Sequence, residues 1–175
     1  MNNSIIRGRI LTFKRMPNSN SDTESYTYVE DGALFITNGT ISKLGSFKEI
    51  KETAPEKITI YDHRPLLIVP GFIDTHLHFP QIQIIGSYAS NLLEWLNTYT
   101  YIEEQKYKEQ HHSELMAKEF FNTLINYGTT TAAAFCTIHP ESVEAFFTES
   151  HRRNMLMIGG KVMMDQNAPT ELLDT

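Results

Sequence analysis

The chain has 175 residues, a length that predicts one domain or two small ones. Hydrophobic residues make up 41% of it, enough for a buried core, and the net charge of -6 argues against a nucleic-acid-binding surface, which would need a basic stripe. The single cysteine, Cys136, excludes an internal disulfide and indicates a reducing, cytoplasmic location. No apolar run approaches the roughly 18 residues of a membrane span, and we expect neither a signal peptide nor a membrane partner.

Residues 1–65 are expected to form short strands without a catalytic constellation. The polar stretch Pro17–Ser25 predicts a surface loop. Asn38 and Gly39 lie between two apolar runs, which predicts a hairpin because both central residues of a type I′ turn need positive φ. The expected strands are Ile5–Phe13, Ala33–Thr37, Thr40–Leu44 and Ile58–Tyr61.

From residue 66 to residue 175, strand patterns alternate with helix patterns, which implies parallel pairing with right-handed crossovers. The β-branched and small residues of Thr129–Phe135 predict a strand buried on both faces. Three βα units are too few for a (β/α)₈ barrel of roughly 250 residues, so an incomplete barrel is expected. The expected strands are Leu66–His78, Thr129–Phe135 and Met155–Met164, and the expected helices are Ser113–Tyr127, Pro140–Asn154 and one starting at Leu172.

The stretch Phe79–His112 predicts a long loop at the carboxyl end of the first barrel strand, where barrel enzymes place their chemistry. Leu92, Leu93 and Leu96 fall on one side of a short helix within it. That helix either packs on the barrel rim or, with Trp95, forms a pocket wall suited to a flat heterocycle.

Three side chains at the end of the strand Leu66–His78 are candidates for chemistry. Alternate residues of a strand point the same way, so Asp74, His76 and His78 are expected to share one face. Two imidazoles at this spacing can bind one metal ion, zinc in particular. An H-x-H pair is a weak motif, and the spacing alone equally fits two exposed or hydrogen-bonded histidines.

The segment Pro70–His78 resembles the first barrel strand of the amidohydrolase superfamily. Three further blocks resemble the guanine deaminase family more narrowly: Phe79-Pro80-Gln81, Leu92–Asn97 and Gly160–Asp165 with Asn167-Ala168-Pro169. The resemblance implies an α/β fold: the first three or so βα units of a TIM-like barrel in residues 66–175, preceded in residues 1–65 by N-terminal strands of a small β-sandwich.

The function implied by the resemblance is hydrolytic deamination of guanine to xanthine and ammonia by water activated on one Zn²⁺, in a cytoplasmic enzyme that is a homodimer at full length. It assigns His76 and His78 to the metal, Gln81 and His78 to the substrate, Trp95 and Leu92 to the pocket wall, and Asp74 to a supporting position behind the ligands. The acid–base glutamate and the other ligands would lie beyond Thr175, so we expect the chain alone to be inactive. Two alternatives stay open: a deaminase of another purine, a pyrimidine or a triazine, and a non-catalytic fragment or assembly module.

The other candidates have simpler explanations in the sequence. His139 is expected at a helix N-cap or the barrel rim, and His111 and His112 are expected to be solvated. His63 has no evident partner, and Lys161 is expected to be an ion-paired lysine or a lysine at the barrel rim. Cys136 is expected to be a small buried hydrophobe, and a lone cysteine excludes the zinc deaminases with a P-C-x-x-C signature.

Overall fold

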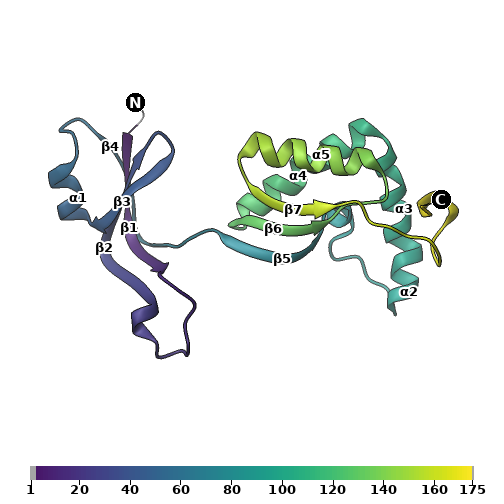
Figure 1. The fold of residues 1–175 in the computed structure, drawn as a ribbon, viewed down its shortest axis with the longest axis horizontal. Helices are drawn as coiled ribbons and strands as arrows, with labels where there is room; N and C mark the ends of the chain where they lie inside the picture. The colour runs from purple at the N-terminus through teal and green to yellow at the C-terminus, as the bar shows by residue number, and fades with distance from the viewer. Residues whose placement is uncertain (1–2, 175) are drawn as a thin grey trace. The chain divides into compact units, whose positions relative to one another are not determined.

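A computed structural model describes residues 3–174 of the chain (Figure 1). The chain divides into two compact units, Met1–Pro70 and Gly71–Thr175. The boundary therefore lies after Pro70 rather than after Pro65. The reason is that Leu67 and Ile68 pair with the first strand of the first unit, where they lie beside Arg9 and Ile10.

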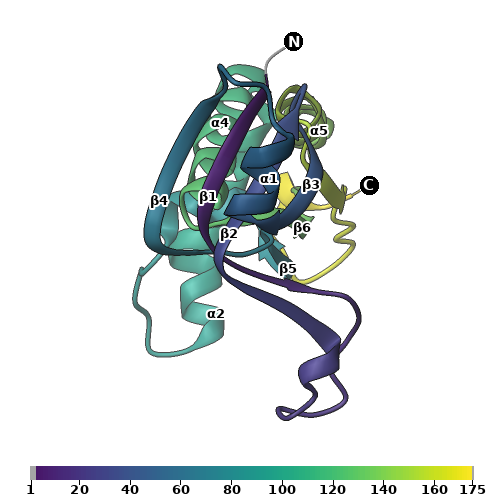
Figure 2. The same ribbon diagram turned by 90° about the vertical axis from the view of Figure 1, so that its left-hand side faces the viewer.

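The first unit is a four-stranded sheet in the order β3-β2-β1-β4 (Figure 2). The predicted hairpin is confirmed: β2 and β3 pair antiparallel, and Asn38 and Gly39 between them have φ values of 50° and 81°. The strands are β1 (Asn3–Phe13), β2 (Tyr26–Thr37), β3 (Thr40–Ser46) and β4 (Thr59–Ile68).

Helix α1 (Phe47–Thr53) in the first unit was not predicted. It begins with a capping box, in which the Ser46 hydroxyl accepts from the backbone of Glu49 and the Glu49 side chain accepts from the backbone of Ser46. The helix buries Ile50 against Ile5 and Ala33. The spacing Ser-x-x-Glu was the available signal for this helix.

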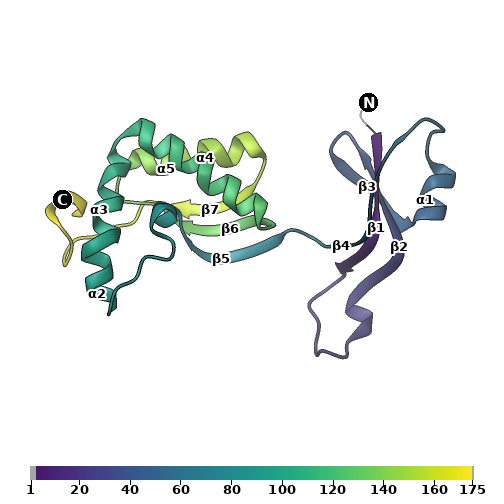
Figure 3. The same cartoon turned by 180° about the vertical axis from the view of Figure 1, so that it is seen from behind.

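The second unit contains a three-stranded parallel sheet in the order β5-β6-β7. Helices α4 and α5 both lie on one face of this sheet (Figures 1 and 3). An aromatic cluster fills the space between helices and sheet, with Phe79, Phe120 and Phe146 in mutual ring contact. Among residues 3–174 no helix is long and apolar enough to cross a membrane. The elements are β5 (Phe72–His78), α4 (Gln110–Asn126), β6 (Thr129–Phe135), α5 (Pro140–Arg153) and β7 (Leu156–Gly160).

The prediction of one strand over Leu66–His78 is wrong, because the segment is divided between β4 and β5. Pro70 separates the two strands and has no backbone N–H to give to a ladder. Gly71 follows Pro70 and lies close to Thr130 of β6. A Cβ at position 71 would lie 2.0 Å from the Thr130 hydroxyl, so a larger residue would clash there. The two residues thus mark the passage from the first unit to the second.

Strand β6 matches its predicted bounds but is not buried on both faces. Ala132 and Ala134 face the helices and are buried, whereas Phe135 is 46% exposed on the opposite side. No second layer among the described residues covers that side, and Ile158 of β7 is also exposed there. Alternating burial is what a sheet with one packed face shows.

Two other segments differ from the sequence prediction. The expected loop Phe79–His112 is mostly helical, with short turns over Phe79–Ile84 and an almost unbroken run of helical segments from Leu92 to Lys108. The third strand is shorter than predicted, and the expected third helix is a single 3₁₀ turn at Thr170–Leu172.

A buried carboxylate of α5, Glu149, holds an arginine that in turn contacts α4. Glu149 accepts hydrogen bonds from Arg152 and Arg153 at 2.6–2.7 Å, and Arg153 also donates to Asn122 of α4 at 2.7 Å. The hydrogen bonds from Arg152, and then the one from Arg153, outweigh burial and lower the pKa of Glu149 from 4.5 to about 2.

Replacing Glu149 with glutamine is therefore expected to destabilise the second unit at neutral pH. A carboxyl whose pKa falls on folding adds stability above its unfolded pKa and loses it as pH drops through the folded pKa. Because Arg152 is largely exposed and screened by solvent, we expect a loss of about 1–2 kcal/mol near pH 7. The difference should shrink from about pH 5 downward and vanish near pH 2, as measured by urea unfolding. Glu144→Gln, an exposed change on the same helix, should have little effect at any pH.

Candidate active site

His76 and His78 lie together at the carboxyl end of β5. Their ring centroids are 5.3 Å apart, and the ring of Phe135 lies 5.8 Å from His76 and 5.1 Å from His78. The pairing register between β5 and β6 shifts after Asp74. Asp74 pairs with Ala132 and Leu77 with Ala134, so β5 advances by three residues where β6 advances by two. Such a bulge changes the direction of a side chain. Here the two imidazoles lie on the side of the sheet that the helices do not cover.

Asp74 does not share the histidine face, which corrects the sequence prediction. Its register partner is Ala132, a residue buried on the helix side, and the bulge follows directly after it. The Asp74 carboxylate accepts the backbone N–H of His76 at 3.0 Å. Asp74 thus fixes the chain at the bulge and acts on the backbone of His76, not on its ring.

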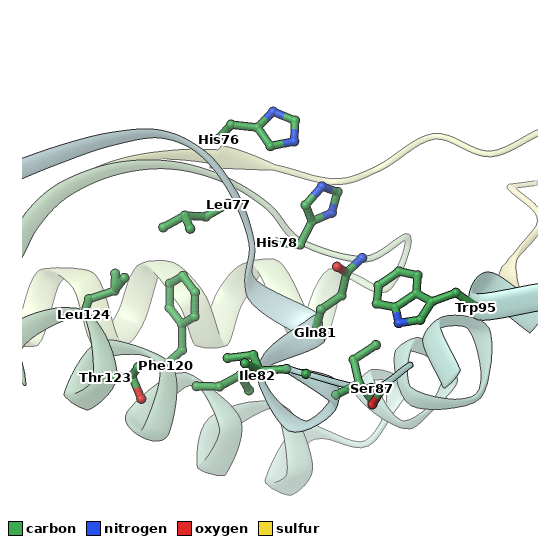
Figure 4. A pocket seen from close by; sticks show the side chains of 13 residues that line it. His76, Leu77, His78, Gln81, Ile82, Ser87, Trp95, Phe120, Thr123 and Leu124 are labelled. Carbon is green, nitrogen blue, oxygen red and sulfur yellow. The ribbon is translucent and has the colours of Figure 1, made fainter. Parts of the chain in front are cut away.

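A pocket of about 380 Å³ opens beside the two histidines (Figure 4). This volume lies within the range of roughly 300–1,000 Å³ that small-molecule sites occupy. Gln81 and Trp95 line the pocket together with both histidines, and Figure 4 shows the Gln81 amide between His78 and the indole ring. Leu92 is 67% exposed and does not line it.

The placement of Trp95 follows from local capping. Asn91 is the N-cap of α2 (Leu92–Trp95), and its side chain accepts the backbone N–H of Glu94 at 3.0 Å. The Glu94 carboxylate in turn accepts the backbone N–H and the hydroxyl of Ser90. These bonds fix the start of the helix, and Trp95 sits half-buried at its end, in the pocket wall.

The sequence prediction missed Glu104, at the end of α3 (Tyr101–Glu104). Glu104 is only 8% exposed, and the helical turn that carries Gln81 packs against α3. Burial raises the pKa of Glu104 to about 7, while the contact with Gln81 acts in the opposite direction. In the sequence Glu104 lies in an acidic, polar run that is typical of a solvated helix face, so no local signal marked it.

The histidine pair fits two positions of a tetrahedral zinc site. Zn–N distances of about 2.0–2.1 Å with tetrahedral angles place two ligating rings roughly 5 Å apart, centre to centre. The observed separation of 5.3 Å agrees. Burial, and then the nearby His76, lower the pKa of His78, which favours the neutral imidazole that binds metals. Across residues 3–174, however, no group of three or more His, Cys, Asp or Glu side chains could hold a metal ion.

The remaining candidates lie outside this group. His139 is the N-cap residue of α5 without a side-chain cap bond, and Lys161 pairs with Asp174 at 2.5 Å. Cys136 is buried, as predicted. The prediction that His112 is solvated is wrong. Its ring packs edge-on against Tyr107 at 4.9 Å, which half-buries it. His111 and His63 are exposed.

Comparison with known proteins identifies the family. Residues 67–174 match the model of the amidohydrolase family, which is more than half of the chain. The chain belongs to the amidohydrolase family. It is 42% identical to the guanine deaminase of Escherichia coli (strain K12) over 97% of its own length and 39% of that protein. The structure of E. coli guanine deaminase superposes with a TM-score of 0.89 at 41% identity, covering 98% of this chain and 40% of that one.

Two further solved structures place this amidohydrolase chain among its neighbours. A guanine deaminase from C. acetobutylicum with guanine bound in its active site gives a TM-score of 0.77 at 28% identity, over 99% of this chain and 39% of that one. An atrazine chlorohydrolase from Arthrobacter aurescens TC1, complexed with zinc and atraton, gives 0.68 at 13% identity over 97% of this chain and 39% of that one, which indicates a shared fold. The chain thus spans about two fifths of the length of the relatives it matches.

Proposed function

We propose that this amidohydrolase chain is the N-terminal part of a zinc-dependent guanine deaminase, which hydrolyses guanine to xanthine and ammonia. The observation that carries the proposal is the grouping of His76, His78 and Gln81 around one pocket, in a chain that is 42% identical to a guanine deaminase. The three parallel strands would be the first three βα units of a TIM-like barrel, and the sheet of the first unit would be part of a small β-sandwich.

Each side chain of the pocket has a distinct part in this chemistry. His76 and His78 would hold Zn²⁺, which when bound lowers the pKa of water toward neutrality. Gln81 would bind guanine, because an amide both donates and accepts, as the edge of a purine requires. The indole of Trp95 offers a flat apolar surface on which a heterocycle can stack.

The complete site needs groups that this chain does not bring together. A zinc hydrolase uses three or more protein ligands and a carboxylate that moves the proton to the leaving ammonia. Two histidines meet only part of that need, so the chain alone should be inactive. We further propose that the full-length protein is a cytoplasmic homodimer. Its substrate is a small molecule and its partners include neither nucleic acid nor membrane.

The test is a chimera in which the 175 residues precede the part of E. coli guanine deaminase that follows the matched segment. The chimera should release ammonia from guanine, and His78→Ala should lower that rate by on the order of 100-fold or more. Adenine, cytosine and a triazine belong in the same panel. Faster turnover of any of these, or no turnover of guanine while the E. coli parent is active, would contradict the proposal.

A further inference from the structure

Three aromatic rings meet at the carboxyl end of β5 and β6, and one of them cannot bind a metal. The rings of His76 and His78 are joined by the ring of Phe135, and each ring contacts the other two. The Phe135 ring is tilted by 34° against His78 and by 74° against His76. Aromatic rings at these separations attract one another and prefer offset or edge-on arrangements. Phe135 is therefore in contact with the whole histidine pair.

The backbone of Phe135 is more regularly paired than that of the histidines. Among the described residues β6 is the central strand of its sheet, and Phe135 pairs with His78 of β5 on one side and with Gly160 of β7 on the other. The register between β6 and β7 runs unbroken up to Phe135, whereas the register between β5 and β6 shifts twice and His76 lies within the second shift. Phe135 thus offers a fixed surface to a less regular part of the sheet.

The strand on the far side of β6 leaves the Phe135 ring free to lie toward the histidines. A Cβ at position 160 would have no heavy atom within 4 Å, so the space beside Gly160 is open. The Phe135 ring is 46% exposed, on the side of the sheet that the helices do not cover, and it lies outside the aromatic cluster under α4 and α5. Removing the ring should therefore leave the core of the second unit intact.

Two exposed imidazoles need an orienting contact if they are to share one metal ion. A histidine side chain rotates about two bonds, and both rings must point a nitrogen at the same place. In metal sites a carboxylate or carbonyl commonly fixes the ring through its second nitrogen. The Asp74 carboxylate instead accepts the backbone N–H of His76. An apolar ring such as that of Phe135 can restrict rotation without occupying a nitrogen that the metal needs.

We infer that Phe135 is a positioning residue for the histidine pair: its ring, held by the central strand, limits both imidazoles to orientations in which they can bind one metal ion. The inference rests on the proposed function only for the identity of that metal, zinc. Phe135 acts through the two imidazoles and supplies no ligand itself.

Phe72 provides a matched control for Phe135. It is a phenylalanine of the same sheet with a similar exposure of 59%, but it pairs with Thr129 at the opposite end of the strands. Phe72→Ala removes the same atoms and leaves the three rings in place. Phe135→Ala removes the contact with both imidazoles, and Phe135→Tyr keeps an aromatic ring at that position.

The first test is nuclear magnetic resonance of the metal-free 175-residue chain at about pH 8, where ordinary histidines are neutral. Three-bond couplings should show one χ1 rotamer for each of His76 and His78 in the unmodified chain, in Phe72→Ala and in Phe135→Tyr. In Phe135→Ala both should average over rotamers, and the imidazole C–H resonances should lose the ring-current shift from Phe135. Averaging in the unmodified chain, which needs no substitution, or single rotamers in Phe135→Ala, would overturn the inference.

Calorimetric titration of the same four proteins with Zn²⁺ separates this inference from the proposed function. If both hold, Phe135→Ala weakens zinc binding on the order of 10-fold, while Phe72→Ala and Phe135→Tyr bind as the unmodified chain does. If no protein binds zinc but the rotamers depend on Phe135, the zinc assignment fails and the positioning role stands. Equal zinc affinity in Phe135→Ala and the unmodified chain would contradict the positioning role and leave the zinc assignment intact.

Discussion

Replacing His78 with alanine is expected to lower the Zn²⁺ affinity of the chain by on the order of 100-fold or more. The two imidazoles at the end of β5 lie 5.3 Å apart, and no group of three or more His, Cys, Asp or Glu side chains within residues 3–174 could hold a metal, so loss of one imidazole leaves this site a single ligand. Changes to groups that merely support a ligand already cost 10–100-fold in metal affinity, and a direct ligand should cost at least as much. Isothermal titration calorimetry with Zn²⁺ at neutral pH measures the effect.

His151 supplies the control for this experiment. It is exposed on α5 in the same unit, so His151→Ala removes an imidazole without touching the pocket. Zinc binding should be unchanged in this variant. Equal zinc affinity in His78→Ala and the unmodified chain would show that the pair on β5 is not a metal site, whatever the family resemblance.

Phe146→Ala should produce the largest loss of stability, about 3–5 kcal/mol. The Phe146 ring is fully buried and lies 5.4–5.6 Å from the rings of Phe79 and Phe121, centre to centre. Truncation removes these contacts and leaves a cavity that the aromatic cluster cannot close. Guanidinium unfolding followed by the fluorescence of Trp95, the one tryptophan of the chain, reports on the second unit.

The neighbouring Phe147 makes the comparison specific. It is 40% exposed on the same helix, so Phe147→Ala removes the same atoms from a site that is already partly in water. We expect a loss of about 1 kcal/mol or less. Similar losses in the two variants would mean that the core is not built around Phe146.

Elements with a strong local pattern were predictable from the sequence. In these elements the local residues suit the backbone conformation that the element needs. Examples are the turn at Asn38-Gly39, the helix start at Pro140 and the strand Thr129–Phe135. Helix α1 was missed although Ser46 begins a capping box, because only Ile50 of its residues is buried and the apolar period is short.

Predictions that depended on tertiary context were less reliable. The run Leu66–His78 is strand-like on both sides of Pro70 and Gly71, and the pairing of Leu67 with Arg9 shows that its two parts belong to two sheets. The face of Asp74 could not be predicted because the bulge before Leu77 breaks strict alternation. Burial on both faces of β6 was a wrong expectation, since it assumed a layer that the described residues do not include.

The candidate site was partly predictable for the same reasons. The spacing of His76 and His78 along one strand brings them together whatever the rest of the fold does, and Gln81 follows closely enough to join them. Glu104 lies 23 residues after Gln81, and only the packing of two helical segments brings these two parts of the chain together. No sequence pattern marks such a pair.

The central claim is that His76 and His78 supply two ligands of a zinc centre. The most direct measurement is X-ray absorption spectroscopy at the zinc edge on the 175-residue chain loaded with one equivalent of Zn²⁺. We predict two imidazole nitrogens at about 2.0–2.1 Å, with the remaining positions filled by water, and loss of both imidazoles in His76→Ala/His78→Ala. Zinc held without imidazole, or the same imidazole count in the double variant, would contradict the account.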